Sequence, residues 1–347
     1  MNNKPLITFA LFAYNQERFI REALEGAFSQ TYSPLEIILS DDCSSDRTFE
    51  IMTKMVENYS GPHKIVLTRN INNQGIGAHI NRIMALANGE LIVVAAGDDI
   101  SVPYRVERIY QIYESKKAKA KSIFSNNLTI DEFGKPYHLQ YEKLKQGNEF
   151  SPSMLVNKDH ILSGCSHAWT RDVFSVFGPL MTPLTCEDMV IPFRSALLGQ
   201  IEYIHEALVM HRMHDKNAWK NYKMKTDIDG DIDFEKFWIF EKKAIYNNWL
   251  KDLQIMEKIS PFRKEELMYL QNIVYERLFD IEEHILMLNG RFIEKVRILA
   301  KNILKKGMKF RNIRHEIGFY LIPKIYRRYM IMKSKPDFDS DRQTIRR

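Results

Sequence analysis

Two adjacent carboxylates, Asp98 and Asp99, directly follow a short apolar run, Leu91–Ala96, and a glycine, Gly97. The run is rich in β-branched residues, which predicts a buried strand. Because open α/β sheets bind ligands beyond the carboxyl ends of their strands, this pair is a candidate site. Neighbouring carboxylates repel each other unless a positive group lies close to them. A hard divalent cation that arrives with a diphosphate is such a group. An ordinary Asp-rich turn also explains these residues.

A second acidic pair, Asp41 and Asp42, ends the predicted strand Leu35–Ser40. Parallel strands end at the same edge of a sheet, so we expect both acidic pairs to reach one crevice. A carboxylate there can accept hydrogen bonds from a ribose or from a base N–H group. A turn with a helix cap at Asp42–Ser44 is the alternative interpretation.

Two further carboxylates, Glu187 and Asp188, begin a predicted helix over Cys186–Leu198. The helix dipole favours negative charge in the first turn, so simple capping explains them. A carboxylate in this position is also a candidate general base that takes a proton from an attacking hydroxyl group. Both interpretations stay open.

Basic and polar side chains lie at the ends of two other predicted strands. His211, Arg212 and His214 lie at the end of the last of them, and arginine suits phosphate contacts while histidine binds metals or donates to phosphates. A single histidine is more often structural, but three such groups within four residues favour the interpretation that they face a phosphate. The loop after the third predicted strand contains the remaining candidates: Arg69, the polar Asn73 and the glycine Gly75.

Two common nucleotide-binding motifs are not present. The pair Gly75 and Gly77 lacks a third glycine in register, which argues against a Rossmann dehydrogenase. The sequence also has no Gly-x-x-x-x-Gly-Lys-Ser/Thr motif, so a P-loop is excluded.

Strands and helices alternate along the first two thirds of the chain. The predicted strands are Leu6–Ala13, Leu35–Ser40, Lys64–Thr68, Leu91–Ala96, Ser122–Asn127, Ile201–Ile204 and Ala207–Arg212. Helices are predicted from Asn15, over Arg47–Tyr59 and Gly77–Leu86, from Pro103, and over Cys186–Leu198. Asp131–Pro152 reads as a loop or hairpin. This alternation predicts parallel pairing and a doubly wound α/β sheet.

Helical periodicity replaces the strand pattern beyond His214, over residues 234–258, 264–289, 291–306 and 316–333. We therefore predict two domains, residues 1–220 and residues 221–347, the second mainly helical. A chain of 347 residues can bury one large core with a smaller addition.

The positive charge is concentrated at the end of the chain. Residues 291–347 carry 17 Lys and Arg against 5 Asp and Glu, and the other residues carry 33 against 39. In residues 291–333 these cations flank apolar positions, a pattern that suits a helix lying on an anionic membrane surface. An amphipathic helical subdomain with a solvated basic face is the alternative. No recognition motif indicates nucleic-acid binding.

The three cysteines, Cys43, Cys165 and Cys186, are widely spaced, which argues against a disulfide framework and against a zinc site. They fit a reducing compartment. The apolar start, Leu6–Tyr14, is too short for a membrane span and has no signal-peptide cleavage site. We expect a cytoplasmic protein, with peripheral attachment to the inner face of the cytoplasmic membrane through the basic tail.

Several segments together resemble the motifs of family 2 glycosyltransferases with the GT-A fold. Glu36–Asp46 reads EIILSDDCSSD and closely matches the family signature Glu-Ile-Ile-x-x-Asp-Asp-Gly-Ser-x-Asp. The other matching segments are Ala13–Glu17, Ala27–Tyr32, Asn73–Asn81, Gly97–Asp99 and Glu187–Asp188. The resemblance covers residues 5–215, with the motifs in family order.

The resemblance implies an α/β fold of GT-A type: a doubly wound, mostly parallel sheet flanked by helices, followed by a mainly α-helical C-terminal region. It implies a metal-dependent inverting transferase that moves one sugar from a nucleotide-sugar, expected to be a UDP-sugar, to a glycan or lipid-linked acceptor in cell-surface polysaccharide synthesis. The Gln-x-x-Arg-Trp motif of processive synthases is missing, which favours single additions.

The roles that the resemblance implies fall into three groups. The nucleotide-sugar would contact Ala13, Asn15, Glu17, Asp41, Asp42, Arg69, Asn73, Gly75, Asp98 and Arg212. Mg²⁺ or Mn²⁺ would be bound by Asp98, Asp99 and His214. Asp188, with Glu187 beside it, would supply the catalytic base.

Two departures from the family pattern bear on these roles. Ala96 stands where many relatives have the first Asp of Asp-x-Asp, so we expect altered donor contacts without loss of the metal. Cys43 replaces the usual glycine of the second motif. The alternatives are a degenerate member that binds a nucleotide-sugar without turnover and a sugar-phosphate nucleotidyltransferase.

Overall fold

The computed structural model describes residues 4–116, 119–139, 150–157, 162–215, 217, 228–289 and 297–298. The chain divides into two compact units. The first comprises Met1–Asn217 with Ala244–Val274, and the second comprises Ala218–Lys243 with Tyr275–Arg347. The segment Ala244–Val274, which the sequence assigns to the second domain, thus belongs to the first unit. A domain boundary near residue 220 stays a prediction.

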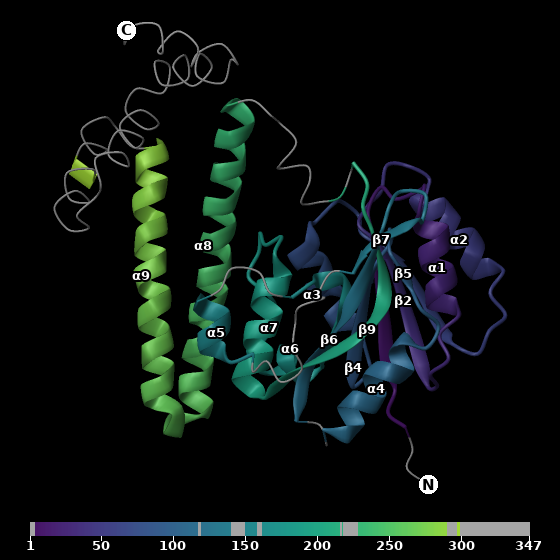
Figure 1. Ribbon diagram of the computed structural model, residues 1–347, viewed down its shortest axis with the longest axis horizontal. Helices are drawn as coiled ribbons and strands as arrows, with labels where there is room; N and C mark the ends of the chain where they lie inside the picture. Colours follow the sequence, from purple (N-terminus) through teal and green to yellow (C-terminus); the bar gives the residue numbers. More distant parts are fainter. Residues whose placement is uncertain are drawn as a thin grey trace, which may run out of the picture. The chain divides into compact units, whose positions relative to one another are not determined.

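Four parallel strands form one half of the sheet in the first unit (Figure 1). They are β1 (Ile7–Ala13), β2 (Leu35–Asp41), β3 (Lys64–Arg69) and β4 (Leu91–Ala96), in the order β3-β2-β1-β4. All four strands were predicted from the sequence. Ala13 pairs with Asp41, and Phe12 pairs with Ala96, so β1, β2 and β4 end together at one edge.

The sheet continues beyond β4 with mixed pairing. Its further strands are β5 (Ile100–Ser101), β6 (Ala120–Ile130), β7 (Pro136–Leu139), β8 (His167–Thr170) and β9 (Gln200–Arg212). Strand β8 runs antiparallel to both β4 and β6, whereas β6 and β9 are parallel. β7 pairs antiparallel with β6, so of the two predictions for Asp131–Pro152, a loop or a hairpin, the hairpin is found over the described residues 131–139.

The prediction of two separate strands after Gln200 is wrong, because β9 is a single strand. Ser125 pairs with Ile204 and Asn126 with Ala207, so His205 and Glu206 bulge out of register. This polar bulge interrupts the apolar pattern in the sequence without ending the strand.

Helices cover both faces of the parallel half. The odd-numbered residues of β1, such as Phe9 and Leu11, share one core with α1 (Ile20–Phe28), α2 (Thr48–Glu57) and α4 (Arg105–Ser115). Helix α3 (Ile76–Leu86) covers the other face, where His79 contacts the ring of Phe12 and the hydroxyl of Ser40. The predicted layers of an α/β fold are thereby confirmed.

The second half of the first unit is organised around α7 (Glu187–Leu198), which is buried from Met189 to Leu197. Three short helices precede α7 in the sequence: α5 (Pro152–Asn157), η1 (Gly164–Ser166) and α6 (Asp172–Phe177). Within this unit the buried guanidinium of Arg194 binds the carboxylate of Asp252 at 2.8 Å and 3.1 Å.

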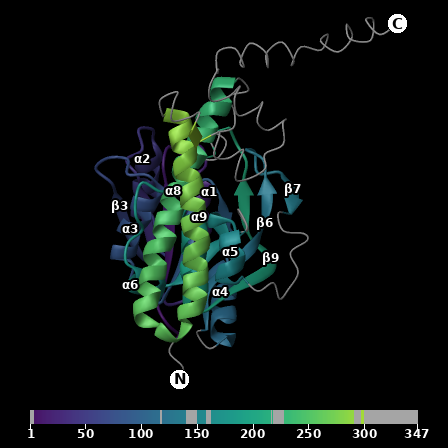
Figure 2. The same cartoon turned by 90° about the vertical axis from the view of Figure 1, so that its left-hand side faces the viewer.

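The C-terminal helices are α8 (Ile228–Ile259) and α9 (Lys264–Asn289), joined through η3 (Pro261–Arg263). They confirm the helices predicted over residues 234–258 and 264–289, and Figure 2 shows them side by side. The helices predicted over residues 291–306 and 316–333 lie outside the described residues, apart from residues 297–298. None of the described helices has a stretch long and apolar enough to cross a bilayer.

Candidate active site

The carboxylates of Asp41 and Asp42 hold the loops at the end of β2. Asp41 is completely buried and accepts hydrogen bonds from Ser44 N at 3.0 Å, from the Ser44 hydroxyl and from Arg69 Nε at 3.1 Å. Asp42 accepts from the backbone N–H groups of Gln74 and Gly75, each at 3.0 Å. The predicted residues Asp41, Asp42, Arg69 and Gly75 therefore meet in one network.

The segment after β1 joins the same network. The backbone N–H of Asn15 donates to Ser44 Oγ at 2.8 Å, and Asn15 Oδ1 accepts from Ser45 N at 2.8 Å. Glu17 Oε2 accepts from Arg47 N at 3.1 Å. Ala13 is buried, and its carbonyl accepts from Asp42 N at 2.9 Å. The predicted donor-contact residues after β1 and β2 are thus adjacent.

Helix α3 begins on a glycine at the end of this network. Gly75 has φ +76°, a left-handed conformation that favours glycine, and it is the N-cap of α3. Asn73 Oδ1 accepts from Gly75 N at 3.0 Å. Both residues are exposed, so the start of α3 is open to solvent.

Asp98 lies beside His214, and both are predicted metal ligands. Its Oδ2 is 3.0 Å from His214 Nε2, and the two residues come from the turn after β4 and from the segment after β9. Burial raises the pKa of the Asp98 carboxyl, and the neighbouring Asp99 raises it further, while His214 opposes both effects. A cation bound beside the two carboxylates would offset the effects of burial and of Asp99.

Gly97 allows this turn to approach the end of β1. A Cβ placed on Gly97 would lie 3.1 Å from the Cβ of Ala13 and 3.0 Å from Ile20 Cδ1, and it would also overlap the side chain of Gln16. Because Ala13 also pairs with Asp41, the turn that carries Asp98 lies next to the network at the end of β2.

The guanidinium of Arg212 is buried and donates to protein groups. Arg212 Nε donates to the Asp98 carbonyl at 3.0 Å, Nη1 to the Glu132 carbonyl at 3.1 Å, and Nη2 to Glu22 Oε2 at 2.9 Å. The side chain is 1% exposed. Arg212 therefore positions the turn that carries Asp98, and its predicted contact with phosphate stays a prediction.

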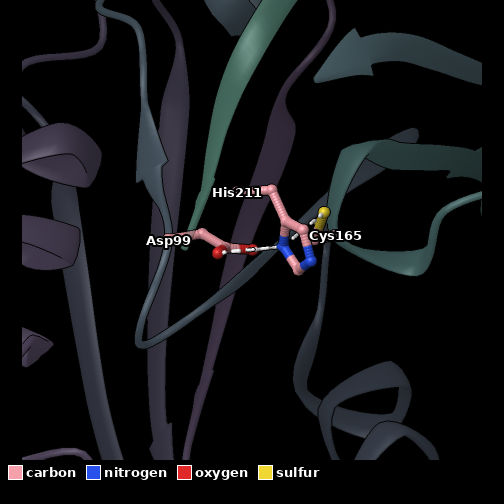
Figure 3. A group of neighbouring side chains, drawn as sticks. All are labelled: Asp99, Cys165 and His211. Atoms are coloured by element: carbon pink, nitrogen blue, oxygen red, sulfur yellow. Dashed lines mark hydrogen bonds and ion pairs between the residues drawn. The ribbon is translucent and has the colours of Figure 1, made fainter. Parts of the chain in front are cut away.

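Asp99, predicted as a ligand of the same metal as Asp98, lies in a different group of side chains. His211 Nδ1 is 3.2 Å from Asp99 Oδ1 and 3.7 Å from Cys165 Sγ, and Figure 3 shows the three side chains pointing toward one another. Burial lowers the pKa of His211, and Cys165 and Asp99 together outweigh it and raise that pKa above its ordinary value. The sequence offers no signal for Cys165, because residues 99, 165 and 211 meet only through the fold.

Glu187 and Asp188 form the first turn of α7, next to η1. A Cβ placed on Gly164 would lie 2.6 Å from Glu187 Oε1 and 3.6 Å from Asp188 Cβ. Gly164 precedes Cys165, which contacts His211. The segments that carry Asp41, Asp98, Cys165 and Asp188 thus lie one beside the next.

Asp98 and His214 fit a divalent cation that arrives with a diphosphate. Each offers one ligand atom, and the two atoms are 3.0 Å apart. Ions such as Mg²⁺ are commonly held by one or two carboxylates together with substrate phosphates and waters, and Mn²⁺ accepts carboxylate ligands in the same way. The donor set is therefore compatible with Mg²⁺ or Mn²⁺.

Comparison with known sequences gives one family. Residues 8–177 match the model described as glycosyl transferase family 2. The chain is 34% identical over 134 residues to the putative glycosyltransferase EpsE of Bacillus subtilis, a match that covers 39% of this chain and 47% of that protein. It is 24% identical over 229 residues to the uncharacterized glycosyltransferase alr2836 of Nostoc, covering 61% and 66% of the two chains. The chain thus spans about half of the length of the first relative and about two thirds of the length of the second.

Comparison with solved structures supports the fold. Residues 1–349 of S. aureus TarS, crystallised in complex with UDP-GlcNAc, superpose with a TM-score of 0.50 at 14% sequence identity. The match covers 82% of this chain and 95% of that chain. The GT-A architecture expected from the sequence is therefore confirmed.

Proposed function

We propose, from the premise that residues 8–177 belong to glycosyl transferase family 2, that this chain transfers one sugar from a nucleotide-sugar to a hydroxyl group of an acceptor. The observation that carries the proposal is that the segments with Asp41, Asp98 and Asp188 lie one beside the next, from the end of β2 over the turn after β4 to the start of α7. We call the row of these segments along the sheet edge the rim. Such a rim can bind the two ends of a nucleotide-sugar and place a base beside the transferred sugar.

The donor would bind along the ends of β1, β2 and β4. Asn15, Glu17 and Asp41 would contact the base and ribose, which we expect to be those of a UDP-sugar. Asp98 and His214 would hold Mg²⁺ or Mn²⁺, whose positive charge stabilises the departing diphosphate. Arg212 keeps the turn around Asp98 in place for this contact.

Asp188 would act as the catalytic base. A neutral alcohol is a poor nucleophile, and a positioned base accelerates its attack by about 10²–10⁴-fold. Asp188 takes the proton of the acceptor hydroxyl while the oxygen attacks the anomeric carbon opposite the leaving nucleoside diphosphate. The C–O bond to the diphosphate breaks as the new one forms, so the configuration inverts.

The acceptor would be a glycan or a lipid-linked sugar used in cell-surface polysaccharide synthesis. The basic residues 291–333 would hold the protein at an anionic membrane surface, where each Lys or Arg is worth about 1 kcal/mol. This part of the proposal rests on the sequence, since these residues lie outside the described ones apart from residues 297–298.

The test is nucleoside diphosphate release from a panel of UDP-, GDP- and dTDP-sugars, with Mg²⁺ or Mn²⁺ and candidate acceptors. We expect one donor to be turned over, with release increased by the correct acceptor. A donor that binds but releases nothing with any acceptor would indicate the degenerate alternative. Pyrophosphate formation from a nucleoside triphosphate and a sugar phosphate would indicate a nucleotidyltransferase instead.

A further inference from the structure

We propose that Asp99, Cys165 and His211 form a binding site for a soft transition-metal ion, best suited to Zn²⁺, that is separate from the cation ligands Asp98 and His214. The wide spacing of the cysteines in the sequence argues against a zinc site, but the fold supplies the other two ligands. The proposal does not depend on the transferase activity.

The spacing of the ligand atoms matches the requirement of a tetrahedral ion. Ligand distances of about 2.3 Å for sulfur, about 2.0 Å for nitrogen and about 2.1 Å for oxygen place neighbouring ligand atoms about 3.4–3.6 Å apart. His211 Nδ1 is 3.7 Å from Cys165 Sγ and 3.2 Å and 3.3 Å from the two Asp99 oxygens. All three ligand atoms lie within 4.8 Å of one another. Small side-chain adjustments would close the site.

The chemistry of the three ligands selects the ion. Thiolate sulfur binds Zn²⁺ strongly and Mg²⁺ poorly, and imidazole also suits Zn²⁺. A carboxylate completes a common zinc ligand set, and water would occupy the fourth position. Binding forms the Zn–S, Zn–N and Zn–O bonds, and the thiol proton of Cys165 passes to solvent.

Neighbouring groups orient two of the ligands. The backbone N–H of Arg212 donates to Asp99 Oδ1 at 2.8 Å. The buried guanidinium of Arg105 donates through Nη2 to the Cys165 carbonyl at 3.0 Å. Such supporting contacts commonly fix metal ligands before the ion binds. The side chain of His211 is 22% exposed, which leaves a route for an ion.

The three ligands come from three separate segments: the turn after β4, η1 and β9. An ion bound here would cross-link these segments, one of which is the turn that also carries Asp98. Since ligand binding to the folded state raises its stability, Zn²⁺ should increase the melting temperature of the full chain.

Cobalt absorption tests the site directly. The full-length protein is titrated with Co²⁺ alone, and a thiolate–cobalt charge-transfer band is expected in the near ultraviolet. The band should persist in Cys43→Ser, a control that removes another free cysteine, and disappear in Cys165→Ser. No band in the wild type, or an equal band in Cys165→Ser, would overturn the proposal.

Zinc affinity provides the second measurement. Competition with a chromogenic chelator should give at least tenfold weaker Zn²⁺ binding in Cys165→Ser and in His211→Gln, with unchanged affinity in Cys43→Ser and His214→Gln. Thermal melting without metal confirms that each variant is folded. Equal losses of Zn²⁺ affinity in His214→Gln and Cys165→Ser would show that the site is not separate from Asp98 and His214. Displacement of bound Zn²⁺ by millimolar Mg²⁺ would contradict the choice of ion. Neither outcome bears on whether the chain transfers sugars.

Discussion

Cys43 has a backbone conformation that glycine adopts without steric cost. Its φ is +63°, and it occupies the position where the family signature has glycine. A side chain in the left-handed region costs roughly 1–2 kcal/mol, partly offset here by the contact of Cys43 Sγ with the Ile71 carbonyl at 3.4 Å. The replacement of the family's glycine by Cys43 therefore introduces local backbone strain at the end of β2.

Replacing this residue should relieve the strain. We expect Cys43→Gly to raise the free energy of unfolding by up to about 1 kcal/mol, since glycine loses more entropy on folding but removes the clash. Urea denaturation of the two proteins measures the change. The control variant at the same position, Cys43→Ala, should show no increase in the free energy of unfolding. A loss of stability in Cys43→Gly would contradict this interpretation.

Asp98 is the side chain whose removal should most directly affect cation binding. We expect Asp98→Ala to weaken Mg²⁺- or Mn²⁺-dependent binding of the nucleotide-sugar at least tenfold, because ligands outside the first coordination sphere alone change metal affinity by about 10–100-fold. Calorimetric titration with and without a chelator measures the affinity for the nucleotide-sugar. Glu25→Ala, an exposed carboxylate on α1, is the control. Full binding by Asp98→Ala, or by the wild type in chelator, would refute the assignment.

The positions of the site carboxylates could be predicted from the sequence, but their partners could not. Asp41 and Asp98 end apolar runs, and this local pattern is enough to place them at the sheet edge. The contacts of Asp42 with the Gln74 and Gly75 backbone, and of Asp99 with His211, join residues far apart in the chain. No local periodicity encodes such contacts.

At the level of secondary-structure elements, a buried ion pair links α7 to α8 within the first unit. Arg194 and Asp252 are both completely buried. Removing one partner leaves an uncompensated buried charge, so Asp252→Ala should destabilise the protein by about 3–5 kcal/mol. Replacing both, in Arg194→Met with Asp252→Leu, should cost much less. Chemical denaturation of the three proteins tests this, and equal losses for the single and the double variant would be inconsistent with the explanation.

Strand β8 contains a histidine that links stability to pH. Burial lowers the pKa of His167 from 6.5 to about 3, and the nearby Arg105 lowers it as well. In the unfolded chain this histidine takes up a proton near pH 6.5. Between pH 6.5 and about 3 the unfolded state therefore binds more protons, and stability decreases as the pH falls.

The contribution of His167 to this slope is up to about 1.4 kcal/mol per pH unit. We expect His167→Gln to make the free energy of unfolding less steep between pH 6.5 and pH 4, whatever its effect at pH 8. Urea denaturation at several pH values measures the slopes. Identical slopes in the two proteins would mean that His167 is protonated in the folded state.

Long periodic elements could be predicted, whereas short or interrupted ones could not. The strands β1 to β4 and the helices α8 and α9 follow regular apolar patterns, and they were predicted. Strand β8 has four residues, too few to show a period. In β9 the bulge at His205 and Glu206 interrupts the apolar pattern, so the sequence does not indicate one continuous strand. Tertiary pairing with β6 creates both of these strands.

At the scale of the whole molecule, the order of the strands brings the site together. The parallel half of the sheet carries Asp41 and the turn with Asp98, while β9 and the segment after it bring His211 and His214 beside that turn, and α7 brings Asp188 beside η1. The alternation of strands and helices predicts a shared edge for the first half of the chain. The antiparallel insertion of β8 between β4 and β6 has no counterpart in the sequence pattern, so the meeting of Cys165 with Asp99 required the structure.

The central claim is that Asp188 is the base of a sugar transfer at this rim, and Asp188→Asn tests it most directly. The measurement compares the donor dissociation constant and the turnover rate in this variant, in the wild type and in Glu265→Gln, an exposed acidic residue in the first turn of α9. We predict unchanged donor binding in all three and a loss of turnover of about 10²–10⁴-fold in Asp188→Asn alone. Turnover by Asp188→Asn at the wild-type rate would contradict the account.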